Sequence, residues 1–124
     1  MSFLIIGCGG KYSDAKKLNE ELLDIMEDFI ADLEKADNAK AAAKAINRYA
    51  DGMEDLLPRM QKISEKYPEL KDKSNPPEEL KESQKRADGM SKEMAGGMMK
   101  LMVYMNDPDV QKAQMRLGSI MTKQ

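Results

Sequence analysis

Histidine and tryptophan are both absent from this chain of 124 residues, and the aromatic side chains number only two Phe and four Tyr. Without histidine the chain lacks the commonest general base and the commonest nitrogen ligand of metals. A serine or cysteine nucleophile has no imidazole partner, and no Glu-x-x-His pair of a carboxylate-bridged di-iron bundle can be written. We therefore expect no enzymatic activity and no cofactor.

The chain also lacks a long apolar run and a strong charge of either sign. Its net charge is −2, so attraction to nucleic acid is not indicated. No stretch approaches the roughly 18–20 consecutive apolar residues that span a bilayer, so any attachment to a membrane depends on a lipid. With a single cysteine there is no intrachain disulfide, and cysteine usage does not decide the redox compartment.

What the chain does contain is typical of helices. Charged residues make up 34% and apolar residues 41%, with Ala, Glu, Lys, Leu and Met in excess. Apolar residues recur at three- and four-residue steps in segments of residues 13–36, 38–67, 77–105 and 107–122. The length fits one domain, which we place at residues 13–124, after a short leading segment of residues 1–12.

Capping signals mark the ends of these segments. Ser13 and Asn38 are expected N-caps of the first two helices, and Asp107 of the last. Pro77 fits the first turn of the third helix. Pro58 lies inside the second pattern and predicts a kink or break just before it.

The predicted fold is all-α: an up-and-down antiparallel helical bundle with three long helices and a short fourth. Short connections make consecutive helices antiparallel neighbours. Phe29 and Ile46 are expected in the core. The acidic end of the first helix should meet the basic start of the second, near Arg48. Asp24, Asp28 and Asp32 share one helix face, which is a solvated face or a loose site for divalent cations.

The cysteine closes the run Ile5-Ile6-Gly7-Cys8. This run resembles the lipobox of bacterial lipoproteins. The resemblance implies that Cys8 is lipidated and becomes the new N-terminus, that residues 1–12 are a signal remnant and tether, and that the protein is anchored in the bacterial cell envelope. Two alternatives remain: a cytoplasmic chain with residues 3–6 as a buried apolar tail, or a strand leading into a glycine-rich phosphate loop at residues 7–10.

Methionine is the unusual feature of the body, with twelve in the chain. Residues 94–105 carry one charge, Lys100, so the third helix is apolar nearly all round and is buried on several sides or faces a partner. The methionines concerned are Met94, Met98, Met99, Met102 and Met105. They form an adaptable core, or a surface for a protein partner, an apolar ligand or a second copy of the chain. Alternatively, their thioethers bind soft metal ions, Cu(I) or Ag(I).

Taken together, these features predict a non-enzymatic helical interaction module, tethered to a membrane through Cys8 and binding a protein or an apolar ligand. The alternatives are a methionine-rich protein that handles soft metals, and a cytoplasmic interaction protein without lipid.

Overall fold

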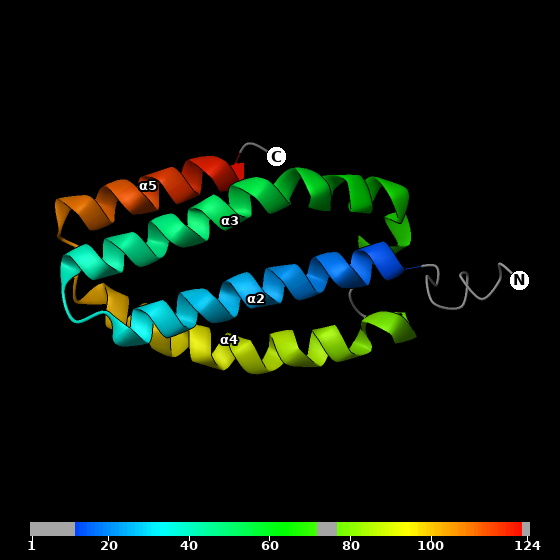
Figure 1. Ribbon diagram of the computed structural model, residues 1–124, viewed down its shortest axis with the longest axis horizontal. Helices are drawn as coiled ribbons and strands as arrows, with labels where there is room; N and C mark the ends of the chain where they lie inside the picture. The colour runs from blue at the N-terminus through cyan, green and yellow to red at the C-terminus, as the bar shows by residue number, and fades with distance from the viewer. Residues whose placement is uncertain (1–11, 72–76, 123–124) are drawn as a thin grey trace, which may run out of the picture.

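The computed structural model describes residues 12–71 and 77–122. Its elements are α2 (Ser13–Lys35), α3 (Ala39–Lys66), the short 3₁₀ helices η1 (Pro68–Lys71) and η2 (Glu78–Leu80), α4 (Lys81–Met102) and α5 (Pro108–Thr122). No strand occurs among these residues, and consecutive α-helices run in opposite directions (Figure 1). The predicted all-α, up-and-down bundle is confirmed. Cys8 and the rest of residues 1–11 lie outside the described residues.

Side-chain caps fix two of the helix starts, as predicted. The Asn38 side chain accepts a hydrogen bond of 2.8 Å from the backbone N–H three residues later. Asp107 accepts two such bonds, of 2.9 and 3.2 Å, in the first turn of α5. The predicted cap at Ser13 is wrong, because Ser13 is already helical and Tyr12 occupies the N-cap position without a side-chain bond.

The predicted break at Pro58 does not occur, since α3 is one helix of 28 residues that contains this proline. Pro58 is exposed, and so is Glu54, whose carbonyl loses its usual backbone donor to the proline ring. Water can satisfy that carbonyl on the outer face. The neighbouring Leu56 and Leu57 are buried and hold this part of α3 in the core.

The order of packing is set by the position of α4. This helix packs on the side of α2 away from α3 and runs parallel to α2 (Figure 1). The helix α5 returns along α3, again in parallel. Across the molecule the helices therefore lie in the order α5, α3, α2, α4. The expectation that each helix packs on its neighbour in sequence holds for α2 and α3, but α4 packs on α2 rather than on α3.

The main core lies at the end of the molecule where all four helices meet. Phe29 and Leu33 of α2, Ile46 of α3, Leu101 of α4 and Val110 of α5 belong to one buried cluster. Phe29 is 5% and Ile46 1% exposed, so both core predictions are confirmed. The ring of Phe29 stacks on Tyr49, with centroids 4.6 Å apart and planes inclined by 18°.

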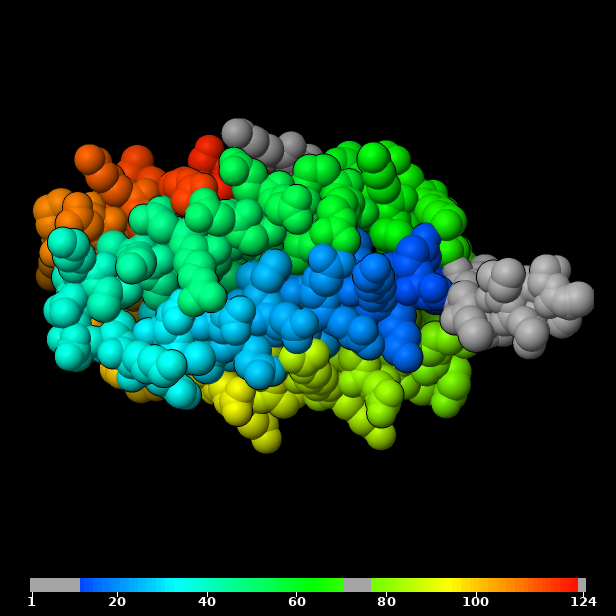
Figure 2. Space-filling view, in the orientation of Figure 1, coloured from blue at the N-terminus to red at the C-terminus, as the bar shows by residue number. Residues whose placement is uncertain are grey.

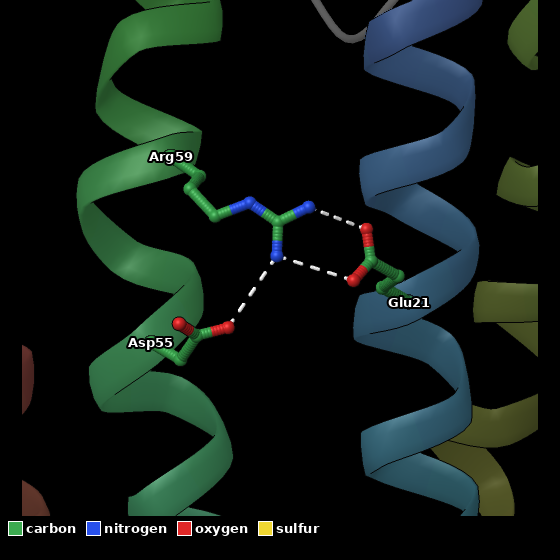
Figure 3. Close-up of polar contacts among 3 residues, drawn as sticks. All are labelled: Glu21, Asp55 and Arg59. Carbon is green, nitrogen blue, oxygen red and sulfur yellow. Dashed lines mark hydrogen bonds and ion pairs between the residues drawn. The ribbon is translucent and has the colours of Figure 1, made fainter.

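Ion pairs join the outer faces of α2 and its neighbours. Arg48 of α3 pairs with Asp32 of α2 at 3.2 Å, in keeping with the predicted meeting of acidic and basic ends. Further along, Arg59 of α3 binds both carboxylate oxygens of Glu21, at 2.6 and 3.1 Å, and also Asp55 at 3.4 Å (Figure 3). These groups are exposed, so each pair contributes about 0–1 kcal/mol and serves mainly to set helix register. The outer face of α2 is left uncovered between α3 and α4 (Figure 2).

Candidate functional site

The structure divides the five predicted methionines between two environments. Met94 is half-buried and packs against the core between α2 and α4. Farther along α4 and just after its end, Met98, Met99, Met102 and Val103 are 43%, 71%, 68% and 78% exposed. We call these four residues the Met face. Met105, in the turn after α4, is 39% exposed.

The Met face lies on a part of α4 whose other side packs closely against α2 at Gly97. A side chain at Gly97 would place its Cβ 3.2 Å from Cδ1 of Leu33, so the glycine allows a contact that a larger residue would push apart. Gly97 and Leu101 form the buried side of this part of α4. Since the core needs only that side, the other side is free to carry exposed methionine. Of the two alternatives predicted for this segment, burial on several sides is therefore wrong, and a face toward a partner stays a prediction.

Two polar contacts keep the Met face free of charge. Lys100 is the only charged residue between Met94 and Met105, and its ammonium group donates a hydrogen bond to the backbone carbonyl of Glu34. A cation there suits the C-terminal end of α2, where carbonyls lack partners. Gln114 of α5 donates to the sulfur of Met105 at 3.2 Å, which ties the turn to α5. The exposed side chains of the Met face are left apolar.

Two of the three acidic residues considered for cation binding, Asp24 and Asp32, form ion pairs. Asp32 pairs with Arg48, and Asp24 pairs at 2.9 Å with Arg86 of α4. Within residues 12–71 and 77–122, no group of three or more Asp, Glu, Cys or His side chains is arranged to hold a metal ion. The acidic face of α2 is thus an outer face that forms ion pairs with arginines of α3 and α4.

The start of α2 is fixed by a polar and aromatic cluster that sequence reasoning did not anticipate. Tyr12 is buried against Tyr67, with ring centroids 4.9 Å apart, and its hydroxyl donates to Glu69 at 2.8 Å. Asp14 accepts hydrogen bonds from Lys66 at 2.7 Å and from the Tyr67 hydroxyl at 2.9 Å. The hydrogen bond from Lys66 is the main reason that the pKa of the Asp14 carboxyl lies below its usual value. Desolvation of the carboxylate acts in the opposite direction and raises this pKa, but by less.

A second apolar feature, a groove of about 550 Å³, opens on α2 between α3 and α4. Leu18, Leu22 and Met26 of α2 lie along it, with Met60 and Ile63 of α3 on one side. The other side is formed by residues of η2 and α4, including Leu80 and Ala87, and Leu70 and Pro77 lie at the end.

The groove exists because α5 is too short to fill it. The helix α5 has 15 residues, about 22 Å, whereas α3 has 28, about 42 Å. Ile120, near the end of α5, packs against a cluster that includes Leu22 and Met60, and these two side chains then continue into the groove. Figure 1 shows α5 ending partway along α3. The difference in predicted helix lengths was a signal in the sequence, but the position of α4 was needed to interpret it.

Within the part of the chain that the structure describes, no helix has the length and apolar character needed to cross a membrane. No protein-family model matches the chain, and comparisons with curated proteins and with solved structures return no match.

Proposed function

We propose that this protein is a non-enzymatic helical module, tethered to a membrane of the bacterial cell envelope through a lipid on Cys8, which binds a protein partner through the Met face. The observation that carries the proposal is the uncharged, exposed apolar surface formed by Met98, Met99, Met102 and Val103. Contiguous exposed apolar surface commonly marks interaction sites in soluble domains.

Methionine suits such a surface for a physical reason. Its unbranched, polarisable side chain adapts to differently shaped partners, which is why methionine is common on binding surfaces of broad specificity. The buried side of α4 is completed by Gly97 and Leu101, so the packing of the bundle does not require apolar residues at the Met face. Binding of a partner explains their presence.

The geometry of the tether supports this arrangement. Tyr12 is held against Tyr67, and only three residues separate it from Cys8, so a lipid on Cys8 lies at most about 14 Å from the bundle. The Met face is level with Leu33, about 30 Å farther along α2. A bundle anchored at Cys8 therefore presents the Met face away from the bilayer, toward partners in the adjoining aqueous compartment.

Fractionation of cells that express the chain behind a complete secretory signal tests the tether. Each buried methylene of the lipid contributes about 0.8 kcal/mol, and two or more chains anchor stably, so we expect the protein in the membrane fraction. Cys8→Ser should release the protein or leave it unprocessed. A wild-type protein found in the soluble fraction with residues 1–7 intact contradicts the tether.

Photo-crosslinking in living cells tests the Met face. A photoreactive amino acid at Met99 should yield a discrete protein adduct, whereas the same amino acid at Glu20, which is exposed on α2, should not. Met102→Glu should abolish the adduct, because a charge at the centre of an apolar contact is costly to bury. Equal adducts at both positions, or an adduct that survives Met102→Glu, contradict the proposed surface.

A further inference from the structure

The groove on α2 is a second site, separate from the Met face and near the opposite end of α2. Its apolar side chains Leu22, Met26, Met60 and Ile63 are only half-buried, although they continue directly from the core. A volume of about 550 Å³, mostly apolar walls and a few polar groups are the usual properties of a site for a small ligand.

The charge of the groove defines the chemistry of its ligand. Among the described residues that line it, Asp88 is the only charged one, and none is Lys or Arg. The uncharged polar residues Asn19, Ser64, Ser83 and Gln84 can form hydrogen bonds with a hydroxyl or an ester. Along this described lining, a carboxylate or phosphate head group finds no cation and meets the negative charge of Asp88. The charge pattern therefore selects a neutral ligand.

The length and flexibility of the groove fit a single aliphatic chain. The lining residues of α2 run from Ala15 to Met26, a distance of about 17 Å. An extended hydrocarbon chain advances about 1.3 Å per carbon, given C–C bonds of about 1.5 Å, so about 13 carbons fit along this floor. Met26 and Met60, on α2 and α3, can adjust their side chains to a narrow ligand.

We propose that this groove binds one unbranched aliphatic chain of a neutral membrane lipid, such as a monoacylglycerol. The groove ends beside the cluster of Tyr12, because Ala15, Ile63 and Leu70 belong both to that cluster and to the lining. The idea that an adjacent bilayer supplies the lipid rests on the proposed tether at Cys8. The proposal that the groove binds an aliphatic chain does not depend on the tether.

The test uses the full chain with Cys8→Ser, which carries no lipid, and ¹³C-methyl methionine for NMR. Dodecanol, a neutral chain of suitable length, should shift the methyl signals of Met26 and Met60 and saturate at one molecule per protein. The signals of Met99 and Met115, which are exposed elsewhere, should not move. Movement of all four signals to the same extent, or of none, overturns the proposal.

Matched substitutions on α4 locate the ligand. Ala87→Phe fills the groove and should weaken dodecanol binding at least about tenfold, which corresponds to about 1.4 kcal/mol. Ala95→Phe makes the same change at an exposed position outside the lining and should leave the affinity unchanged. Should Ala87→Phe fail to fold, Ser64→Phe blocks the groove from α3 and decides the matter. Binding that ignores the blocking variant overturns the proposal.

Charge is tested with dodecanoate, the anion of the same chain length. Dodecanoate should bind more weakly than dodecanol. The difference in affinity between the two ligands should become smaller in the Asp88→Asn variant, and smaller in the parent protein when 0.5 M salt is added. Tighter binding of dodecanoate than of dodecanol overturns the assignment to a neutral lipid.

Two other occupants give distinct results, and either one overturns the proposal. If residues 3–6 of the chain fill the groove, Ile5→Asp alone shifts the signals of Met26 and Met60 and strengthens dodecanol binding. If a second copy fills it, these signals change with protein concentration and dodecanol has no effect. The measurement uses unlipidated protein. A negative binding result therefore does not contradict the proposed tether, and evidence against the tether does not contradict binding in the groove.

Discussion

Replacement of Phe29 by Ala should be among the most damaging single changes in the bundle. Phe29 is 5% exposed, lies in the cluster where the four helices meet, and stacks on Tyr49. Its burial contributes about 2–3 kcal/mol and the ring contact about 1 kcal/mol. The cavity left behind adds to this loss, and we expect a total of about 4 kcal/mol, within the usual range for such a change.

The change should be visible in both chemical and thermal unfolding. At about 2.1 cal/mol/K per residue, 124 residues give an unfolding entropy near 0.26 kcal/mol/K. A loss of about 4 kcal/mol then lowers Tm by about 15 °C. Circular dichroism at 222 nm follows the helices during urea titration and heating, and the urea midpoint should fall while the slope stays constant.

Met99→Ala is the matched control, since it also truncates a large apolar side chain but on the exposed Met face. It should change stability by less than about 1 kcal/mol. If Met99→Ala destabilises the protein as much as Phe29→Ala, the Met face takes part in packing and the reasoning that assigns it to a partner fails.

Three further outcomes are expected. Asp14→Asn should reduce the loss of unfolding free energy at acid pH. The folded-state pKa of Asp14 is lowered, so its contribution to stability is present above about pH 4 and is lost as the pH falls through the folded-state pKa. Urea titrations of parent and variant from pH 2 to 7 measure this difference. Arg59→Ala should cost less than about 1 kcal/mol, and 1 M salt should mask the effect if screened pairing is its cause. Replacement of Met94, Met98 and Met102 together by Leu should keep the fold, at less than about 1.5 kcal/mol per swap. Titration of the parent with Cu(I) against a chelator should detect no stoichiometric site, and one tight ion that the triple variant loses would favour the soft-metal alternative.

The helices of the bundle were predictable because their signals are local. Asn38 and Asp107 cap helices by contacts within a single turn, so residue type and position suffice to identify them. Phe29 and Ile46 lie on strongly periodic faces and are buried as expected. Of the kink or break predicted at Pro58, the break does not occur, because tertiary packing of its buried neighbours keeps the helix continuous despite one missing hydrogen bond.

Sequence reasoning was weaker where the outcome depends on which helices pack together. Both Gly52 and Gly89 lie in an Ala-Asp-Gly-Met run inside a helix. A Cβ at Gly52 would come within 3.0 Å of Ile25, whereas one at Gly89 meets nothing within 4 Å. The sequence around the two glycines is the same, and only the position of α2 distinguishes them. The groove escaped prediction for the same reason, since it depends on α4 crossing to the far side of α2.

The proposed tether and the proposed role of the Met face are linked by an energetic argument. A Met or Val side chain gains about 1.5–3 kcal/mol on full burial, and the four residues of the Met face are 43–78% exposed, so they forgo roughly 4–8 kcal/mol together. A partner that covers them recovers this energy, but association costs about 4–15 kcal/mol, so the Met face alone supports only weak binding.

Confinement to a membrane compensates for such weakness, because it raises the effective concentration of the protein near partners held at the same surface. Cys8→Ser should therefore reduce the yield of the Met99 crosslink in cells, although the Met face is far from Tyr12, where the described chain begins. Solvent exposure of Met99, measured by its rate of oxidation in purified protein, should be the same with and without Cys8→Ser. A crosslink of undiminished yield in the Cys8→Ser variant would mean that the Met face binds its partner without help from the tether.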